Sequence, residues 1–465
     1  MVPSPHDDER ASRQHDLIVW GATGFTGKLL SNYLAENYGP SGHSVKYALG
    51  GRSEAKLTKL REDLAQETAD KRFLDTPLVI GNAGSEESMQ RLAKQTRVVA
   101  SLVGPFEKSG ENLVKACAEA GTHYVDITAE YPFMRRMIVK YSSLAEENGA
   151  KIVHACGFDS VPSDMGTFMV QAYAKEHFGH PCQRIRYGLT RLIGLVSGGT
   201  VHSLIELFSF PLAVRQVRNE DTYLVDPMTI EESVTQETMK LSGWMLCREE
   251  CAWDPNFGAY AAPFIMAPTN TKIVKRTAAL LPTVYGSEFD YGECLAVRNM
   301  IVARLFAWFT LLCEAVLIAF PAARWIVKAL LRPGWGPPAF IRRLCCFAGD
   351  IVGTVRDGVG KYHKITGRVG INEDPGYDGT AKMLCESALC AALDAPTIPS
   401  TCGVLTPAVA FGPTLIKRLK KTGMTFEVAA TEMDAAESTD MGSDTKRSDD
   451  SLTARRAVHH RAQRK

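Results

Sequence analysis

The chain has 465 residues, of which 45% are hydrophobic and 23% charged, a composition typical of a folded protein with a large core. The formal net charge of +1 excludes a global electrostatic attraction to nucleic acid, so we expect no nucleic-acid partner. The twelve cysteines form no CxxC pair and no group has metal-ligand spacing, so we predict buried thiols of a reducing compartment and no metal site.

The N-terminal third has the pattern of a parallel α/β fold. Residues 1–15 are polar and lack the apolar core of a signal peptide, so we predict a disordered leader. From residue 16 to 160, short apolar runs alternate with helical patterns, as in βαβ units. The expected strands are 17–20, 45–49, 78–80, 98–103, 124–127 and 152–155, and the expected helices include 25–37, 54–68, 110–120 and 133–148. We therefore predict an N-terminal Rossmann domain with a doubly wound parallel sheet.

The pattern changes after residue 160. Residues 161–372 contain longer, less regular segments, which predict a second, α/β or α+β domain for the substrate. Residues 373–428 contain a turn and then a helix at 380–393, predicted to return to the first domain. Residues 429–465 are rich in charged and small polar residues and should be disordered.

A glycine-rich loop follows the first expected strand and opens the first expected helix. It consists of Gly21, Ala22, Thr23, Gly24, Phe25, Thr26 and Gly27. Such a loop needs one glycine for a tight turn, one for close approach to a pyrophosphate and one for helix–strand packing. Free N–H groups at the helix start then bind the phosphates. The loop predicts a dinucleotide site, and the alternative is an ordinary βα turn with incidental glycines.

The end of the second strand distinguishes the cofactors. An NAD site usually has an acidic residue there, whereas this chain has Arg52 and Ser53, with Arg52 lying 25 residues after Gly27. A guanidinium pairs well with the 2′-phosphate of NADP, and a serine hydroxyl adds a donor. We therefore predict NADP(H) rather than NAD(H). The alternative is a solvent-exposed arginine that begins a helix.

The segment after the fourth strand is expected to line the nicotinamide side of the site. It contains Val103, Gly104 and Pro105. Ligands of such sheets bind beyond the carboxyl ends of the strands, which is where these residues fall. Phe106 follows, and either covers the nicotinamide ring or belongs to the core.

Several ordered motifs together resemble one family. They are Ser-Leu-Val-Gly-Pro-Phe at 101–106, Gly-Thr-His-Tyr-Val-Asp-Ile-Thr at 121–128, Gly-Phe-Asp-Ser-Val-Pro-Ser-Asp at 157–164, Ala-Pro-Phe-Ile-Met-Ala-Pro at 262–268, Asp-Pro-Gly-Tyr at 374–377 and Cys-Gly-Val-Leu-Thr-Pro-Ala at 402–408. These motifs resemble the saccharopine dehydrogenase-like oxidoreductases, a group that includes the bacterial trans-acting enoyl reductases. The resemblance runs from about residue 16 to 428. At 128–130 the chain has Thr-Ala-Glu where relatives commonly have a glycine before the glutamate, which puts only that turn in doubt.

This resemblance implies a Rossmann domain joined to a saccharopine-reductase-like second domain, and a pyridine nucleotide as cofactor. It does not imply saccharopine as substrate. The bacterial relatives imply reduction of an enoyl group on a lipid precursor, as in glycolipid synthesis. The eukaryotic relatives imply association with lipid droplets and other membranes.

Candidate acids follow the fifth and sixth strands, but no arrangement singles out one proton donor. Tyr124, Asp126 and Asp159 are the candidates, and Glu130 lies just beyond the fifth strand. Asp159 and Ser160 either face the substrate or cap a helix at the domain junction. For Tyr124 the alternative is a core aromatic within a strand. We find no Tyr-x-x-x-Lys acid pair, and no Ser-His-Asp arrangement can be assigned from spacing.

Residues 301–330 contain an apolar segment of almost membrane-spanning length. At 100° per residue its polar positions, Arg304, Thr310, Glu314, Arg324 and Lys328, share one side, as in an interfacial helix. Pro321 should kink it. Arginines 324, 332, 342 and 343 and Lys328 could face anionic headgroups. We predict peripheral attachment through 301–343 to the cytoplasmic side of a membrane or to a lipid droplet. The alternatives are a core or dimer helix and a true span.

The sequence therefore predicts an NADP-dependent oxidoreductase that reduces an enoyl or carbonyl group of a hydrophobic, lipid-derived substrate. A cofactor supplies the hydride in such enzymes, and the protein supplies orientation and a dry pocket. One alternative is a non-catalytic nucleotide-binding scaffold or sensor on lipid droplets. Another is an amino-acid dehydrogenase of the saccharopine type, which would need several arginines for substrate carboxylates. The sequence leaves a homodimer open.

Overall fold

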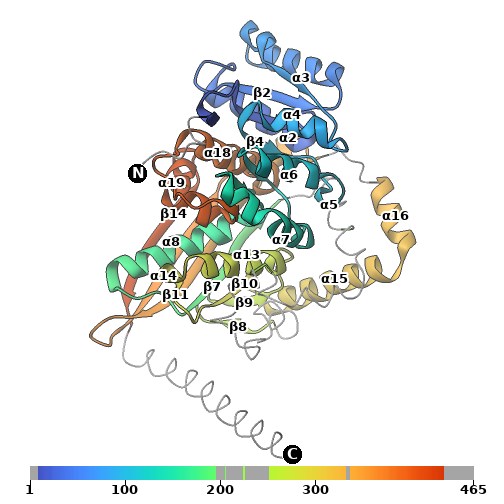
Figure 1. Cartoon of the computed structure of the whole chain (residues 1–465). Coiled ribbons are helices and arrows are strands. Elements are labelled where there is room, and N and C mark those ends of the chain that lie inside the picture. The colour runs from blue at the N-terminus through green and yellow to red at the C-terminus, as the bar shows by residue number, and fades with distance from the viewer. Residues whose placement is uncertain (1–8, 195–204, 206–223, 226–250, 331–335, 434–465) are drawn as a thin grey trace, which may run out of the picture.

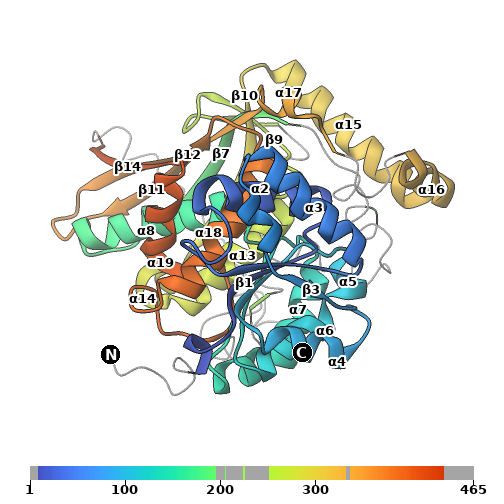
Figure 2. The same ribbon diagram turned by 90° about the horizontal axis from the view of Figure 1, so that it is seen from above.

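The computed structural model describes residues 9–194, 205, 224–225, 251–330 and 336–433. Within these residues the chain forms a parallel sheet with helices on both faces and a second, mixed sheet (Figure 1). Seen from above, the C-terminal helices α18 and α19 lie between the two halves (Figure 2). The fold class predicted from the sequence is confirmed.

The first sheet has the strand order β13-β6-β5-β4-β1-β2-β3, and every pair in it is parallel. Its strands are β1 (His15–Trp20), β2 (Tyr47–Gly51), β3 (Leu78–Ile80), β4 (Thr96–Ser101), β5 (His123–Asp126), β6 (Lys151–Val153) and β13 (Gly403–Leu405). All six strands expected in this region overlap an observed strand. Because β1 lies between β2 and β4, the order reverses there, which is where such sheets bind their ligands.

The helices of this half are α2 (Phe25–Tyr38), α3 (Glu54–Glu67), α4 (Glu86–Ala93), α5 (Phe106–Ser109), α6 (Glu111–Glu119) and α7 (Tyr131–Glu147). Four of them, α2, α3, α6 and α7, match the expected helices, while α4 and α5 are not among the expected helices. Ser53 and Ser85 cap α3 and α4 with their side chains, so local capping chemistry fixes where these helices begin.

The second sheet has the order β14-β12-β11-β7-β10-β9-β8, with β7 and β10 parallel and its other pairs antiparallel. Its strands are β7 (Arg184–Ile193), β8 (Trp253–Asp254), β9 (Ala259–Ala262), β10 (Asp290–Val297), β11 (Cys346–Arg356), β12 (Tyr362–Ile371) and β14 (Thr425–Glu432). The helices α8 (Val161–Phe178) and α13 (Ala267–Leu280) lie against it, and α14 (Pro282–Tyr285) packs on these two helices (Figure 1). A Cβ at Gly166 would lie 2.4 Å from Ile351 Cδ1, so this glycine lets α8 approach the sheet closely.

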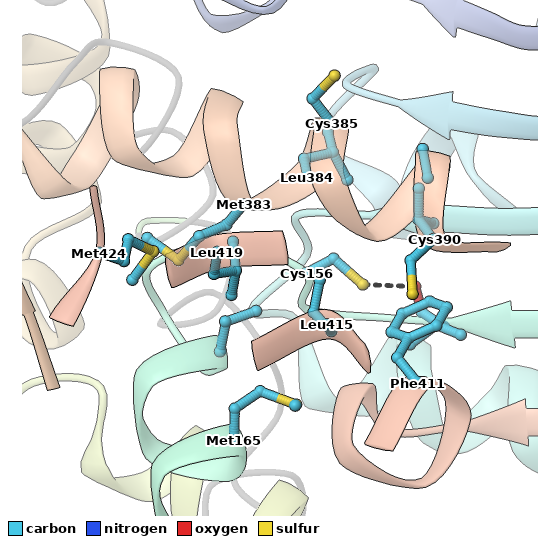
Figure 3. Packing of buried hydrophobic residues seen from close by; sticks show 14 of the residues in the cluster. Cys156, Met165, Met383, Leu384, Cys385, Cys390, Phe411, Leu415, Leu419 and Met424 are labelled. Atoms are coloured by element: carbon cyan, nitrogen blue, oxygen red, sulfur yellow. Dashed lines mark hydrogen bonds between the residues drawn. The ribbon is translucent and has the colours of Figure 1, made fainter. Parts of the chain in front are cut away.

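The C-terminal segment belongs to both sheets. Helix α18 (Thr380–Leu393) packs on α2, β4 and β5, β13 adds a seventh strand to the first sheet, and β14 adds an edge strand to the second. Helix α19 (Pro407–Lys421) packs on α18 and α8. Figure 3 shows the apolar contact among these helices, with Met165 of α8 facing Leu415 and Leu419 of α19. The strands before residue 160 thus lie in the first sheet and those within 161–372 in the second, while the segment after 372 adds one strand to each.

The predicted disordered leader is wrong for residues 9–15. Arg10 is only 6% exposed, and its Nη1 donates to the carbonyl oxygens of Gly121 and Gly149, both at 2.6 Å. Arg13 donates to the carbonyl oxygen of Thr96 at 2.9 Å, and His15 begins β1. These arginines satisfy carbonyl groups at the amino end of the sheet, which orders the segment. The predicted disordered tail is wrong for residues 429–432, which pair with β12 as the end of β14. Residues 1–8 and 434–465 lie outside the described residues.

The cysteines are free thiols where the structure describes them. Nine of the eleven described cysteines are buried, and only Cys313 and Cys402 are partly exposed. Burial raises the pKa of Cys117 and Cys385, which disfavours the reactive thiolate. Cys247 lies outside the described residues.

An exposed apolar arm extends from the second sheet. It consists of α15 (Met300–Ala319) and α16 (Pro321–Leu330), and in Figures 1 and 2 α16 lies at the end far from both sheets. The break at Phe320, just before Pro321, agrees with the predicted kink. Helix α15 contacts the rest of the chain through Ala303 and Ala307, which pack with Cys251 and Ala262.

The arm turns its large apolar side chains outward. Trp308 and Trp325 are each 72% exposed, and Leu305 is 64% exposed. By length and composition α15 is the one described helix that could cross a membrane, and 12% of its 300–317 window is buried. A helix buried inside the described part of the chain, one of the three alternatives, is therefore wrong. Arg332 lies outside the described residues.

Candidate active site

The glycine loop has the geometry that a dinucleotide needs. It joins β1 to α2 at the point where the strand order reverses. Gly21 has a φ of +93°, and a Cβ on Gly27 would lie 2.2 Å from the carbonyl oxygen of Gly21. Gly24 is exposed at the N-cap of α2, and no side chain in the described part of the chain caps this helix. The first N–H groups of α2 are therefore open to a phosphate, so the loop fits a pyrophosphate.

The segment after β4 lies directly against this loop. Leu102 N donates to the carbonyl oxygen of Trp20 at 2.9 Å, and a Cβ on Gly21 would lie 2.8 Å from Val103 Cγ2. Gly104 and Pro105 continue the segment to the start of α5. Phe106 is 4% exposed and packs on Phe133 with ring centroids 6.1 Å apart, so it belongs to the core.

Arg52 and Ser53 lie at the carboxyl end of β2, next to β1 in the sheet. Arg52 is exposed and makes no ion pair with any described residue, so its guanidinium is available to a phosphate. Ser53 Oγ accepts from Lys56 N at 3.4 Å and thereby caps α3, while its hydroxyl proton can still be donated. NAD sites usually have an acidic residue at the end of this strand, where this chain has Arg52. A positive charge at that position fits the 2′-phosphate of NADP better than the free ribose hydroxyls of NAD.

Asp126 is fully buried and has partners on every side. Its carboxylate accepts from Tyr124 OH at 3.0 Å and from the N–H groups of Thr128 and Ala155, both at 3.1 Å. His154 Nδ1 lies 2.8 Å from Asp126 Oδ2. Burial and the nearby carboxylate raise the pKa of Tyr124 well above its ordinary value. These contacts join β5 to β6, so the structure gives Asp126 and Tyr124 a visible structural role, and their catalytic roles stay a prediction.

Glu130 caps the short helix α5. Its two carboxylate oxygens accept from Phe106 N at 3.1 Å and Glu107 N at 2.8 Å, and its side chain is buried. This holds the Gly104–Pro105 segment beside the glycine loop. Glu130 N donates to Thr128 Oγ1 at 3.1 Å, so the turn at 128–130 is closed by a hydrogen bond without the glycine that relatives commonly have.

Asp159 differs from Asp126 in its surroundings. It lies between β6 and α8, it is half-buried, and desolvation raises its pKa to about 6. It makes no hydrogen bond or ion pair within the described part of the chain. Its neighbours are fixed, since Phe158 N donates to Thr380 Oγ1 at 3.1 Å and Ser160 Oγ donates to Asn270 Oδ1 at 2.8 Å. The capping alternative is wrong for Ser160, whose hydroxyl bonds α13 instead of the start of α8.

A buried polar cluster connects α8, α13 and β10, and sequence reasoning missed it. Asn270 Nδ2 donates to Glu293 Oε1 at 2.8 Å, and Tyr291 OH donates to Glu293 Oε2 at 3.0 Å. Ser163 Oγ lies 3.3 Å from Glu293 Oε1. Burial raises the pKa of Glu293 to about 7. The cluster lies beside Ser160 and therefore beside the turn that carries Asp159.

Asp164 forms a second buried carboxylate site on α8. It accepts from Thr277 Oγ1 at 2.5 Å and from Ala408 N at 2.8 Å, and burial raises its pKa to about 7. These bonds join α8 to α13 and α19. The motifs at 157–164 and 402–408 contained Asp164 and Ala408, but nothing in the sequence pairs them.

Comparisons with known proteins agree with this architecture. Residues 17–153 match the saccharopine dehydrogenase NADP binding domain. A trans-acting enoyl reductase of Mycobacterium tuberculosis (strain ATCC 25618 / H37Rv) is 32% identical over 427 residues, covering 89% of this chain and 97% of that protein. Another protein of that strain, named provisionally for the same activity, is 34% identical over 432 residues, with the same two coverages. The trans-acting enoyl reductase of Mycobacterium ulcerans (strain Agy99) is 30% identical over 441 residues, covering 91% and 99%.

Among solved structures, the apo saccharopine dehydrogenase (L-Glu forming) of Saccharomyces cerevisiae is similar with 12% sequence identity and a TM-score of 0.45, covering 90% of this chain and 100% of that one. The matched NADP-binding domain contains the glycine loop and Arg52. The protein is thus an NADP-dependent oxidoreductase, and the chain belongs to the saccharopine dehydrogenase-like family of the trans-acting enoyl reductases.

Proposed function

We propose that the protein reduces an enoyl or carbonyl group of a lipid-derived substrate with NADPH, at a lipid surface on which the arm of α15 and α16 lies. The observation that carries the lipid part of this proposal is the exposed apolar face of the arm. The relatives named as enoyl reductases support the reaction class.

The residues toward the cofactor have separate tasks. The N–H groups at the start of α2 hold the pyrophosphate, Arg52 pairs with the 2′-phosphate, and Val103, Gly104 and Pro105 line the nicotinamide side. Bound NADPH supplies the hydride that reduces the substrate double bond. The chain itself must then provide orientation and one proton.

Asp159 is our candidate for the proton donor. Hydride addition to one end of a conjugated double bond leaves negative charge that a proton must neutralise. A carboxyl group with a pKa of about 6 is partly protonated near neutral pH, which suits a general acid. The half-buried side chain can recover its proton from solvent. Its position beyond the carboxyl end of β6 is on the same side of β1 as the expected nicotinamide.

The test compares Asp159→Asn with wild type in the reduction of long-chain trans-2-enoyl thioesters. We expect kcat to fall by on the order of 100-fold while the Kd for NADPH is unchanged, since the amide cannot donate a comparable acidic proton. For wild type, the rate should fall as pH rises through about 6. The matched control is Asp75→Asn, an exposed aspartate elsewhere on the first domain. An Asp159→Asn enzyme with the wild-type rate and pH profile would exclude Asp159 as the donor.

The arm has the composition of an interfacial surface. Its outward side chains include Ile301, Leu305, Trp308, Phe309 and Leu312, each more than 60% exposed. At 100° per residue they fall on one arc, opposite Ala303 and Ala307, which contact the body. Tryptophans favour the boundary between headgroups and acyl chains.

Charge complementarity supports an anionic lipid surface as the occupant. Arg304 is exposed on α15, Arg324 is partly exposed on α16, and Arg343 is exposed just after α17 (Ala339–Arg342). Arginines on the rim of an apolar face are attracted to anionic headgroups. A helix that lies in the interface keeps such charges in water, whereas a spanning helix must bury them at a cost of about 2.5–3.5 kcal/mol each near the centre.

Vesicle flotation tests this surface. Wild type should float with phosphatidylcholine vesicles that contain phosphatidylglycerol, and a Trp308→Ser, Phe309→Ser, Leu312→Ser variant should not. A control with Leu74→Ser, Val139→Ser and Val359→Ser removes exposed apolar side chains elsewhere and should float like wild type. If the arm variant instead floats normally and changes from dimer to monomer in light scattering, the arm is a dimer interface.

A further inference from the structure

The short helix α17 connects the apolar surface to the core of the enzyme. Phe340 and Leu344, on and just after this helix, are 68% and 73% exposed. Arg342 points inward: its Nε donates to Asp378 Oδ2 at 2.7 Å and its Nη1 to the carbonyl oxygen of Pro337 at 2.8 Å. One turn of helix therefore carries apolar side chains for a lipid surface and an arginine that is fixed to the protein.

The inward side of this segment packs on the glycine loop. The guanidinium carbon of Arg342 lies 5.6 Å from the ring centroid of Phe25, and a Cβ on Gly336 would lie 2.3 Å from Phe25 Cζ. The ring of Tyr377 meets the same ring edge-on, with centroids 5.3 Å apart. These contacts are the aromatic and cation–π interactions expected to fix a ring in place.

Phe25 is the first residue of α2, directly after the N-cap Gly24. Its N–H belongs to the helix start that we assign to the pyrophosphate. Its side chain, however, is held by residues that follow position 335 in the sequence. The backbone that binds phosphate is thus fixed partly by the segment that carries Phe340.

We infer that lipid docking and NADPH binding are coupled through α17. Insertion of Phe340 and Leu344 into a lipid surface immobilises α17, and through Arg342 it immobilises Phe25 and the start of α2. NADPH then binds a glycine loop that is already ordered, so binding loses less conformational entropy. The affinity of the protein for NADPH therefore rises on the lipid surface. Because such coupling is reciprocal, NADPH also strengthens lipid binding. This inference rests on the lipid surface proposed above.

The experiment measures the Kd of NADPH with and without phosphatidylcholine–phosphatidylglycerol vesicles. We expect wild type to bind NADPH several-fold more tightly with vesicles. In Arg342→Ala, which loses the contact to Phe25, the two Kd values should agree while vesicle flotation persists. The control Arg356→Ala removes a similar contact elsewhere, between an arginine and the ring of Tyr362, and should keep the wild-type ratio. A further variant, Phe340→Ser with Leu344→Ser, removes the apolar side chains that would enter the lipid surface. Its Kd for NADPH should therefore be the same with and without vesicles.

The outcomes separate the two ideas. If wild type floats with vesicles but its Kd for NADPH is the same in both conditions, the coupling is overturned and the lipid surface stands. If wild type does not bind vesicles, both are overturned. Equal ratios for Arg342→Ala and wild type would show that the contact with Phe25 does not transmit the effect, which also overturns the inference.

Discussion

Two regions at the same edge of the first sheet use similar residues in opposite ways. At β5, Asp126 has four partners within the chain, and Glu130 caps the start of α5. Elsewhere along the edge, Asp159 has no partner among the described residues, and no side chain caps α2. Buried polar groups are normally satisfied, and the hydrogen bonds of the first region give it a structural role. In the second region the polar groups have no such partners, and we propose that they bind the cofactor and substrate.

The largest difference should appear in stability. Asp126→Ala leaves a buried hydroxyl, an imidazole and two backbone N–H groups without their acceptor, and should lower the free energy of unfolding by roughly 3–5 kcal/mol. Asp159→Ala should not lower it, because no hydrogen bond is lost and a desolvated carboxylate with a raised pKa is removed. Urea denaturation of both variants measures this. Similar losses of unfolding free energy in the two variants would contradict the distinction drawn between Asp126 and Asp159.

Nucleotide binding should respond next most strongly, through the glycine loop. In Gly27→Ala the new Cβ would lie 2.2 Å from a backbone oxygen, so the loop must open and lose its phosphate contacts. We expect the Kd for NADPH to rise at least about 100-fold, or roughly 2.7 kcal/mol. Gly358→Ala is the control, because its Cβ would meet open space. Calorimetry that finds equal affinity in both variants would contradict a phosphate site at this loop.

Glu293 extends the comparison of Asp126 with Asp159, because its carboxyl group is hydrogen-bonded and yet has a raised pKa. Its pKa of about 7 in the folded state exceeds the ordinary value of about 4.3. Its stabilising contribution is complete below about pH 4 and is lost as pH rises through 7. The full loss should be on the order of 3–4 kcal/mol, since each pKa unit corresponds to about 1.36 kcal/mol, and Glu293→Gln should flatten the dependence. Denaturation between pH 5 and 8 checks this, and an unchanged slope in the variant would place the titration elsewhere.

The smallest effect concerns the choice of cofactor. Arg52→Ala should weaken NADPH binding by about tenfold, or roughly 1.4 kcal/mol, because an exposed charge-assisted contact to the 2′-phosphate is lost. NADH, which lacks that phosphate, should bind the variant and wild type equally. Calorimetry with both nucleotides measures the difference. Equal weakening for the two would mean that Arg52 acts on the loop as a whole.

Local sequence predicted most of the first domain because its signals are local. The expected strand at 78–80 and the helix at 380–393 agree with the structure residue for residue. Alternating apolar periods and capping serines fix such elements from within a few neighbouring positions. The glycine loop could be found for the same reason, since its three glycines lie within seven residues.

The ordered N-terminal arginines could not be found this way. Arg10 bonds carbonyl oxygens more than one hundred residues away, and a polar leader carries no sign of such partners. The same holds for Glu293, whose partner Asn270 lies on a different element. Periodicity and composition do not encode which buried polar groups meet.

The sequence by itself determined the parallel sheet, the dinucleotide loop, the preference for NADP and the apolar character of residues 301–330. These depend on residue type and spacing over short distances. Only the tertiary structure decided that Asp126 is hydrogen-bonded while Asp159 has no such bond to a described residue, that the C-terminal segment joins both sheets, and that the segment of α17 packs on Phe25. Hydrogen bonding and burial depend on which distant segments meet, and that follows from the packing of the whole chain.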